Sequence, residues 1–169
     1  MAFVSVYFSL GTNMGRREEN ISRALTMLDE ALGCHWTALS HIIETRSWGF
    51  SGPKFLNAAV MYRIFRQPVS AEQQALDLLD MVKSIEARMG REGAPVFNPE
   101  TGERIYENRI IDIDILFFGD ERIDNPRLTV PHRLIGERDF VLFPLREIAK
   151  PSLKTSFPEY FQTASRNNK

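Results

Sequence analysis

The stretch Arg109-Ile110-Ile111-Asp112-Ile113-Asp114-Ile115-Leu116-Phe117-Phe118 (RIIDIDILFF, residues 109–118) decides the fold of this chain. Its β-branched and aromatic residues alternate with two aspartates, which is the period-2 pattern of a β-strand. Side chains two residues apart on a strand point to the same face, about 6–7 Å apart. Asp112 and Asp114 therefore share one face, and the isoleucines around them occupy the other, which we expect to enter the core.

Two carboxylates side by side on a strand are costly unless a cation or an arginine lies beside them. Mg2+ typically takes one or two carboxylates together with phosphate oxygens and water. A solvated strand face paired with lysine or arginine explains the aspartates equally well, so the pair alone leaves both interpretations open. Arg109, next to the strand, and Glu86, late on the preceding helix, favour a magnesium site.

The segment before this strand divides into a helix and a long polar loop. Residues 70–89 have helical spacing, with Ser70 and Gln73 as a capping box and Gly90 as the terminator. The expected apolar face consists of Leu76, Leu79, Val82, Ile85 and Met89. Residues 91–108 contain two glycines and two prolines. Polar loops of this length inside a domain are usually functional lids or disordered, and we expect this one to close over bound substrates.

The remaining elements complete the fold prediction. We expect strands over 4–10, 36–45 and 55–65, a helix over 16–32, a short strand near 122–124 and a helix over 140–149. This order predicts an α+β fold with a ferredoxin-like βαββαβ core, in which an antiparallel sheet carries helices on one face and C-terminal helices are added. We expect one domain over 1–169, with a peripheral tail after about residue 150 that holds a short helix at most.

Composition excludes several classes of protein. The chain has 21 basic and 22 acidic side chains in 169 residues, which gives no global reason to expect nucleic-acid or membrane-surface binding. Its one cysteine, Cys34, fits a reducing cytosol, and the longest apolar runs are far shorter than the ~20 residues of a membrane helix. We therefore expect a cytoplasmic protein without a membrane or nucleic-acid partner.

A series of short motifs resembles the 6-hydroxymethyl-7,8-dihydropterin pyrophosphokinases of folate biosynthesis. The motifs occur in order and with similar spacing at 9–15 (SLGTNMG), 44–49 (ETRSWG), 55–60 (FLNAAV), 85–86 with 90–91, 109–116, 127–132 (RLTVPH) and 138–142 (RDFVL). The resemblance implies an enzyme that transfers pyrophosphate from Mg-ATP to the pterin hydroxymethyl group and releases AMP. It also implies ATP and the pterin as the small-molecule partners and two Mg2+ ions. We expect the protein to be a monomer.

The resemblance also assigns roles to individual residues. It implies that Asp112 and Asp114 bind both metal ions and act in catalysis with Arg91 and Arg109, and that Asp112 helps to position or deprotonate the hydroxyl. The implied pterin-binding residues are Thr45, Trp48, Phe55, Asn57 and Phe140. The implied ATP-binding residues are Glu86, Arg91, Arg109, Ile115, Leu128, Thr129, His132 and Arg138.

The chain departs from the family pattern in two places. Arg46 and Ser47 occupy the family's usual proline positions, and the loop 92–108 is longer than usual. Tyr106 stands roughly at the family's tryptophan position, and Arg104 is a candidate substitute for one of its arginines.

Two non-enzymatic hypotheses compete with this interpretation. A ferredoxin-like binding or regulatory module does not explain an acidic pair that faces several arginines. An RNA-binding sheet needs a basic surface and exposed aromatic residues, which the balanced charge opposes. For single residues, core packing is the alternative role of Phe55 and Phe140, and an ordinary surface role is the alternative for His132.

Overall fold

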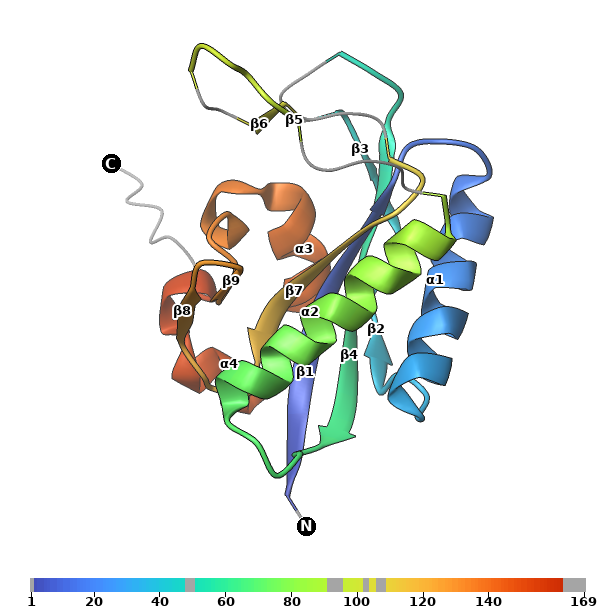
Figure 1. Ribbon diagram of the computed structural model, residues 1–169. Helices are drawn as coiled ribbons and strands as arrows, with labels where there is room; N and C mark the ends of the chain where they lie inside the picture. The colour runs from blue at the N-terminus through green and yellow to red at the C-terminus, as the bar shows by residue number, and fades with distance from the viewer. Residues whose placement is uncertain (1, 48–50, 91–95, 102–103, 106–108, 163–169) are drawn as a thin grey trace, which may run out of the picture.

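A sheet of five strands forms the centre of the protein in a computed structural model that describes residues 2–47, 51–90, 96–101, 104–105 and 109–162 (Figure 1). The middle strand, β1 (Phe3–Thr12), pairs antiparallel with β4 (Phe55–Phe65) on one side and with β7 (Asp112–Phe118) on the other. The short strands β2 (Ala38–Leu39) and β3 (Ile43–Thr45) pair antiparallel with the far edge of β4.

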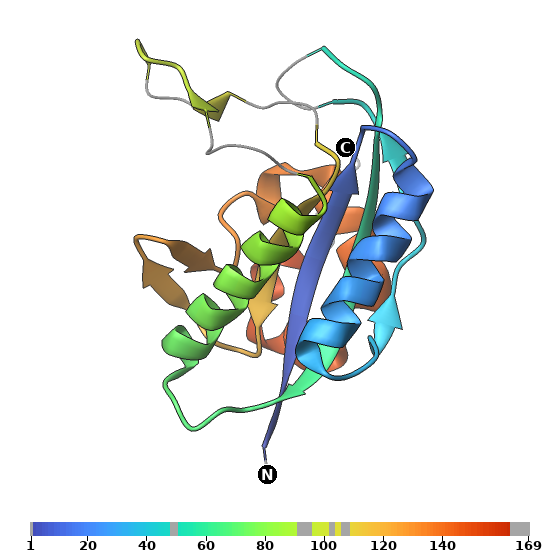
Figure 2. The same ribbon diagram turned by 45° about the vertical axis from the view of Figure 1, so that its right-hand side comes forward.

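Helices cover both faces of this sheet, as Figure 2 shows. The helices α1 (Arg17–Leu32) and α2 (Ala71–Arg88) pack on one face, and α3 (Asp139–Ile148) and α4 (Pro151–Ser156) pack on the other. The ferredoxin-like α+β prediction is confirmed, and the added C-terminal helices cover the face that α1 and α2 leave free.

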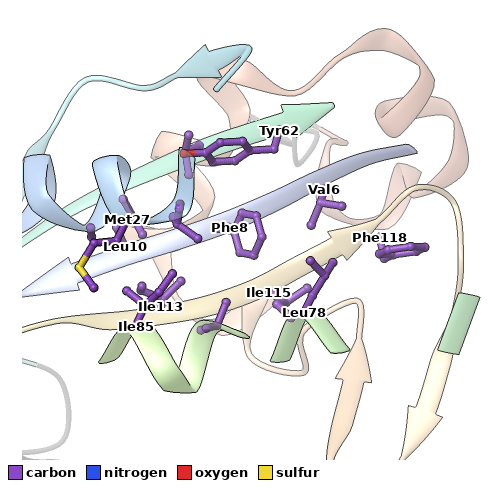
Figure 3. Close-up of a cluster of buried hydrophobic side chains, with 14 of the residues drawn as sticks. Val6, Phe8, Leu10, Met27, Tyr62, Leu78, Ile85, Ile113, Ile115 and Phe118 are labelled. Atoms are coloured by element: carbon purple, nitrogen blue, oxygen red, sulfur yellow. The ribbon is translucent and has the colours of Figure 1, made fainter. Parts of the chain in front are cut away.

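The larger core lies between the sheet and the first two helices. Alternate residues of β1 point into it, among them Phe8, whose ring meets that of Tyr62 edge-on at 5.9 Å (Figure 3). Ile113 and Ile115 enter the same core from β7, as the alternating pattern predicts. Burial of this apolar surface provides the main force that holds α1 and α2 on the sheet.

The predicted start of α2 is confirmed in atomic detail. The Ser70 side chain accepts a hydrogen bond from the Gln73 backbone N–H at 3.0 Å. The apolar face of the helix was predicted only in part, because Leu76 and Leu79 are half-buried whereas Leu78 lies in the core. The other buried apolar residues of this face are Ala75, Val82, Ile85 and, at the C-cap, Met89.

The predicted strand over 36–45 is wrong as a single element. It is interrupted at Ser40, whose backbone N–H donates to the Ala59 carbonyl at 2.9 Å while its hydroxyl accepts from the Ala59 N–H at 2.8 Å. The Ser40 side chain thus replaces a backbone acceptor, and the backbone hydrogen bonding between this segment and β4 is locally irregular. Side-chain chemistry of this kind does not appear in hydrophobic periodicity.

Short strands were the elements most easily missed. The polar loop contains β5 (Val96–Phe97) paired with β6 (Arg104–Ile105), and the chain after β7 forms a hairpin of β8 (Ile123–Asn125) and β9 (Leu128–Val130). Only the region of β8 was predicted. A strand of two or three residues is too short to show alternation.

The tail is not peripheral as far as the structure describes it. Two 3-10 helices, η1 (Ile135–Glu137) and η2 (Pro158–Tyr160), flank α3 and α4. Leu153 and Phe157 are buried in the second core, together with Tyr7 and Phe117 of the sheet. The part of the chain that the structure describes contains no helix long and apolar enough to cross a membrane.

Candidate active site

The two aspartates of β7 lie where the strand pattern predicts them. Both are half-buried, and each is opposite a β1 residue: Asp112 is paired with Gly11, and Asp114 with Ser9. Residues opposite each other in an antiparallel ladder project to the same face. The carboxylates therefore project on the face of the sheet that α3 covers, away from α1 and α2.

A cavity of about 770 Å3 lies along the outer edge of β7, between α2 and the β8–β9 hairpin. This volume is in the range of small-molecule and cofactor pockets. The structure brings eight predicted site residues together around it: Glu86, Asp112, Asp114, Ile115, Leu128, Thr129, His132 and Arg138. The cavity is also lined by three cationic residues that sequence reasoning did not single out as site residues, namely Lys83, Arg127 and Arg133.

Glu86 and His132 hold the outer edge of β7. The Ile113 N–H, between the two aspartates, donates to Glu86 Oε2 at 3.1 Å. Farther along the strand, the His132 N–H donates to the Leu116 carbonyl at 3.1 Å. Glu86 is 4% exposed, so it is a buried carboxylate and not a charge on the helix surface.

The ring of His132 is oriented by its neighbours. Nδ1 accepts a hydrogen bond from the Leu134 N–H at 3.2 Å, so a neutral ring carries its proton on Nε2. Nε2 lies 3.8 Å from Asp114 Oδ1. A hydrogen-bond donor therefore points toward the acidic end of the cavity, where an anionic ligand would accept it.

Arg138 joins the two predicted substrate regions. Arg138 is 6% exposed and lines the cavity, and its guanidinium lies 5.6 Å from the centre of the Phe140 ring. Phe140 is partly buried against the second core, on the face of the sheet that carries the aspartates. The predicted nucleotide and pterin regions are therefore adjacent.

Three predicted pterin residues gather at one end of the sheet. Asn57 of β4 is paired with Gly11 of β1 and with Ile43 of β3, and Phe55 is paired with Thr45. The Asn57 Nδ2 donates to Thr45 Oγ1 at 2.7 Å, which fixes the orientation of the amide. These residues do not line the 770 Å3 cavity but lie beside it, across β1 from Asp112.

Asn13 is a buried residue whose role sequence reasoning missed. Its Oδ1 accepts from the Arg109 N–H at 2.7 Å, its own N–H donates to the Arg109 carbonyl at 2.9 Å, and its Nδ2 donates to the Pro53 carbonyl at 3.2 Å. Arg109 itself is half-buried and lies outside the cavity lining. Asn13 thus links the residue range just before β7 to the segment before β4. In the sequence, only its place in the motif 9–15 could have indicated this role.

Arg17 makes a second tie near the pterin residues. Its guanidinium donates to Glu44 Oε2 and to the Lys54 carbonyl, both at 2.9 Å. The hydrogen bond from Arg17 lowers the pKa of Glu44. The first turn of α1 therefore holds both β3 and the segment that leads into β4.

Some predictions fall outside the described residues. Trp48 and Arg91 are not described, and most of the loop 92–108, including the side chain of Arg104 and all of Tyr106, is not described either. The lid therefore stays a prediction. Among the residues that are described, no group of three or more His, Cys, Asp or Glu side chains forms a metal site. A metal ion held by Asp112 and Asp114 would need further ligands from phosphate or water.

The fold and the cavity define a ferredoxin-like α+β protein that has a nucleotide-sized site beside paired strand carboxylates. The chain belongs to the 7,8-dihydro-6-hydroxymethylpterin-pyrophosphokinase (HPPK) family, whose sequence model matches residues 7–150. The matched range includes the cavity, every predicted site residue and all of the sheet except the first residues of β1.

Similar curated proteins carry the corresponding name. The chain is 38% identical over 146 residues to a 2-amino-4-hydroxy-6-hydroxymethyldihydropteridine pyrophosphokinase of Porphyromonas gingivalis, covering 85% of this chain and 90% of the relative. It is 34% identical to the Bacillus subtilis enzyme of the same name, covering 85% and 77%. A folate synthesis bifunctional protein of Arabidopsis thaliana is 37% identical, but the match covers only 27% of that longer chain.

Solved structures support the fold. An HPPK-DHPS in complex with substrates matches with a TM-score of 0.58 at 15% identity, covering 94% of this chain and 44% of that chain. The wild-type HPPK-DHPS of Plasmodium falciparum with pteroate matches with a TM-score of 0.53 at 16% identity, covering 94% and 42%. The chain thus spans less than half of these longer proteins, and the likeness concerns the fold alone.

Proposed function

We propose that this protein transfers a pyrophosphoryl group from Mg-ATP to the hydroxymethyl group of 6-hydroxymethyl-7,8-dihydropterin, giving AMP and the pterin pyrophosphate. One observation supports this above the others. In a chain of the HPPK family, the cavity beside β7 combines two carboxylates with His132 and Arg138, which suits a metal-bound polyphosphate.

The nucleotide would bind along the outer edge of β7. Ile115 and Leu128 supply an apolar wall of the cavity, and Glu86 and Thr129, which also line it, would supply polar groups for the adenosine. His132 and Arg138 would donate hydrogen bonds to phosphate oxygens. Arg91 and Arg109 are the further arginines that we expect at the phosphates.

The paired aspartates fit the metal requirement of such a reaction. Asp112 and Asp114 would hold the two ions through oxygen ligands, and phosphate oxygens and water would complete the coordination. Held there, Mg2+ would supply positive charge to neutralise the triphosphate and help to orient the attacking and leaving oxygens. Asp112, which is closer to the pterin residues in the sheet register, would orient the hydroxyl and accept its proton.

The pterin would be recognised at the end of the sheet. The Asn57 amide and the Thr45 hydroxyl can pair with the donor and acceptor edge of the ring, and Phe55, Phe140 and Trp48 would supply aromatic contacts. A monomer in the cytoplasm remains the expected state. A non-catalytic binding module gains no support from the relatives, because those at 34–38% identity are named as pyrophosphokinases or as a folate synthesis protein.

The reaction product tests the proposal directly. The protein is incubated with ATP, Mg2+ and 6-hydroxymethyl-7,8-dihydropterin, and nucleotides are separated by chromatography. AMP should accumulate in step with the pterin pyrophosphate. ADP in place of AMP would refute transfer of two phosphates, and a folded protein that makes neither nucleotide would support the binding-module hypothesis.

Asp114→Ala tests the metal assignment. Loss of one carboxylate should leave the fold intact and lower Mg2+-dependent binding of ATP, with turnover falling by about 100-fold or more, on the order of 3 kcal/mol. Asp120→Ala is the matched control, because this aspartate is exposed in the turn after β7 and lies outside the cavity lining. Equal turnover in the two variants would exclude Asp114 as a metal ligand.

Asn57→Ala tests the placement of the pterin. It should raise the KM for the pterin much more than the KM for ATP, since Asn57 lies outside the nucleotide cavity. A change confined to ATP affinity would contradict this placement.

A further inference from the structure

Gly11 occupies the centre of the proposed reaction site. It lies on the middle strand of the sheet and is directly opposite Asn57 on one side and Asp112 on the other. The Asn57 amide, which we propose to bind the pterin, and the Asp112 carboxylate, which we propose to bind metal, therefore project from the same face of the sheet. Only the backbone of Gly11 lies between them.

The backbone conformation does not explain a glycine at this position. Gly15, Gly33, Gly90 and Gly119 have positive φ angles, whereas Gly11 does not and lies in a regular ladder paired on both sides. Glycine inside a strand lowers stability by roughly 0.5–1 kcal/mol relative to alanine. Such a glycine often marks a place where another group approaches the backbone closely.

The space that a Gly11 side chain would fill is bordered by two of the proposed pterin-binding residues, Asn57 and Phe55. A Cβ atom built on Gly11 would lie 3.2 Å from Asn57 Oδ1 and 3.7 Å from Cδ1 of the Phe55 ring. The first distance is tighter than ordinary van der Waals contact, and Asn57 is held in place by its hydrogen bond to Thr45. A side chain here would therefore press on the amide and occupy the space in front of the Phe55 ring.

The sheet geometry adds a second constraint. Neighbouring strands are about 4.8 Å apart, so Asn57 and Asp112 stand roughly 10 Å apart across β1. A ligand whose ring pairs with Asn57 and whose hydroxymethyl arm reaches a metal ion at Asp112 has to pass over Gly11. A bicyclic ring with a one-carbon arm has suitable dimensions for that path.

We propose that Gly11 is a specificity-determining residue, whose bare backbone forms the floor over which the pterin passes from Asn57 to Asp112. This inference rests on the proposed function and adds a residue to it. The glycine sets how close the pterin comes to the sheet and, through that depth, how close its hydroxyl comes to the acidic pair.

Gly11→Ala tests the proposal. The KM for 6-hydroxymethyl-7,8-dihydropterin should rise by about tenfold or more, because one methyl group fills the floor of the site. The Kd of a non-hydrolysable ATP analogue with Mg2+, measured by calorimetry, should change by less than about twofold, since Gly11 does not line the nucleotide cavity. An unchanged pterin KM, or equal losses for both ligands, would overturn the proposal.

Gly136→Ala is the matched control. This glycine is exposed and also has no positive φ, and its added methyl group would meet only Tyr160, at 4.0 Å. The control should keep the pterin KM of the starting protein. An equal rise of the pterin KM in Gly136→Ala would show that the effect of Gly11→Ala does not depend on the position of Gly11 in the site.

A double-mutant cycle separates contact with the ligand from pressure on Asn57. Asn57→Ala removes the oxygen that the new methyl group would meet, which also keeps the comparison possible if Gly11→Ala alone fails to fold. The double variant should have a still higher pterin KM than Asn57→Ala. Equal pterin KM values in these two variants would mean that Gly11 acts only by leaving room for Asn57. Direct contact between the pterin and the backbone of Gly11 would then be refuted.

The proposed function and this inference fail in different ways. If the starting protein forms no AMP from ATP and the pterin, the reaction assignment is wrong. If it forms AMP and Gly11→Ala has the same pterin KM, the reaction stands and the role of Gly11 is wrong.

Discussion

Glu86 places an acidic side chain inside the protein, beside two further acidic residues. Its carboxylate accepts the Ile113 N–H on the edge of β7 that has no neighbouring strand in the described structure. A buried carboxylate is tolerated when hydrogen bonds and cations compensate its charge. The same carboxylate thus contributes to the wall of the proposed nucleotide cavity and fixes the backbone between Asp112 and Asp114.

Substitutions of Glu86 separate its hydrogen bond from its charge. Glu86→Ala leaves the Ile113 N–H without this acceptor, so the free energy of unfolding in urea should fall by about 2 kcal/mol. Glu86→Gln keeps an acceptor and should lose clearly less. Glu30→Ala, at an exposed position of α1, should stay within about 0.5 kcal/mol of the starting protein. Equal losses for Ala and Gln would show that the charge, and not the hydrogen bond, matters.

At the scale of elements, the N-terminus of α2 gives a separate prediction. Ser70→Ala removes the acceptor of the Gln73 N–H and should lower the free energy of unfolding by about 1 kcal/mol. Ser84→Ala is the matched control, because Ser84 is exposed inside the same helix, where alanine is the better helix former. A loss for Ser84→Ala as large as that for Ser70→Ala, measured by the same denaturation, would argue against the cap.

Elements with a clear period could be predicted, and elements shaped by single polar side chains could not. The strand from Phe55 to Phe65 was predicted to the residue, and α1 and α2 to within one residue at each end. Residues 36–45 failed as one strand because the Ser40 hydroxyl takes a place in the ladder. The β8–β9 hairpin is too short for alternation, although it forms one wall of the proposed nucleotide cavity.

The candidate site shows the same division. Strand periodicity alone placed Asp112 and Asp114 on one face, while the family resemblance supplied His132 and Arg138. Neither showed the backbone contacts of Asn13, because a turn asparagine has no periodic signal. Nor did they indicate the role of Gly11, which depends on its pairing with strands from distant parts of the chain.

At the scale of the whole molecule, the sheet lies between two helical layers that serve different parts of the site. α2 forms a wall of the proposed nucleotide cavity from one face, and α3 places Phe140 on the other. The second layer is fixed to the sheet by apolar contacts centred on Phe117, whose ring lies 5.0 Å from that of Phe157. Residues beyond 150 therefore support the layer from which Phe140 projects.

Phe157→Ala tests whether this segment is part of the folded core. Phe157 is fully buried, so its truncation should lower the free energy of unfolding by about 3–5 kcal/mol through lost burial and a cavity. Phe143→Ala is the matched control, because Phe143 on α3 is 59% exposed, and its loss should cost less than about 1 kcal/mol. The pterin KM of Phe157→Ala should also rise, since α3 carries Phe140. Equal and small losses in both variants would make the segment peripheral after all.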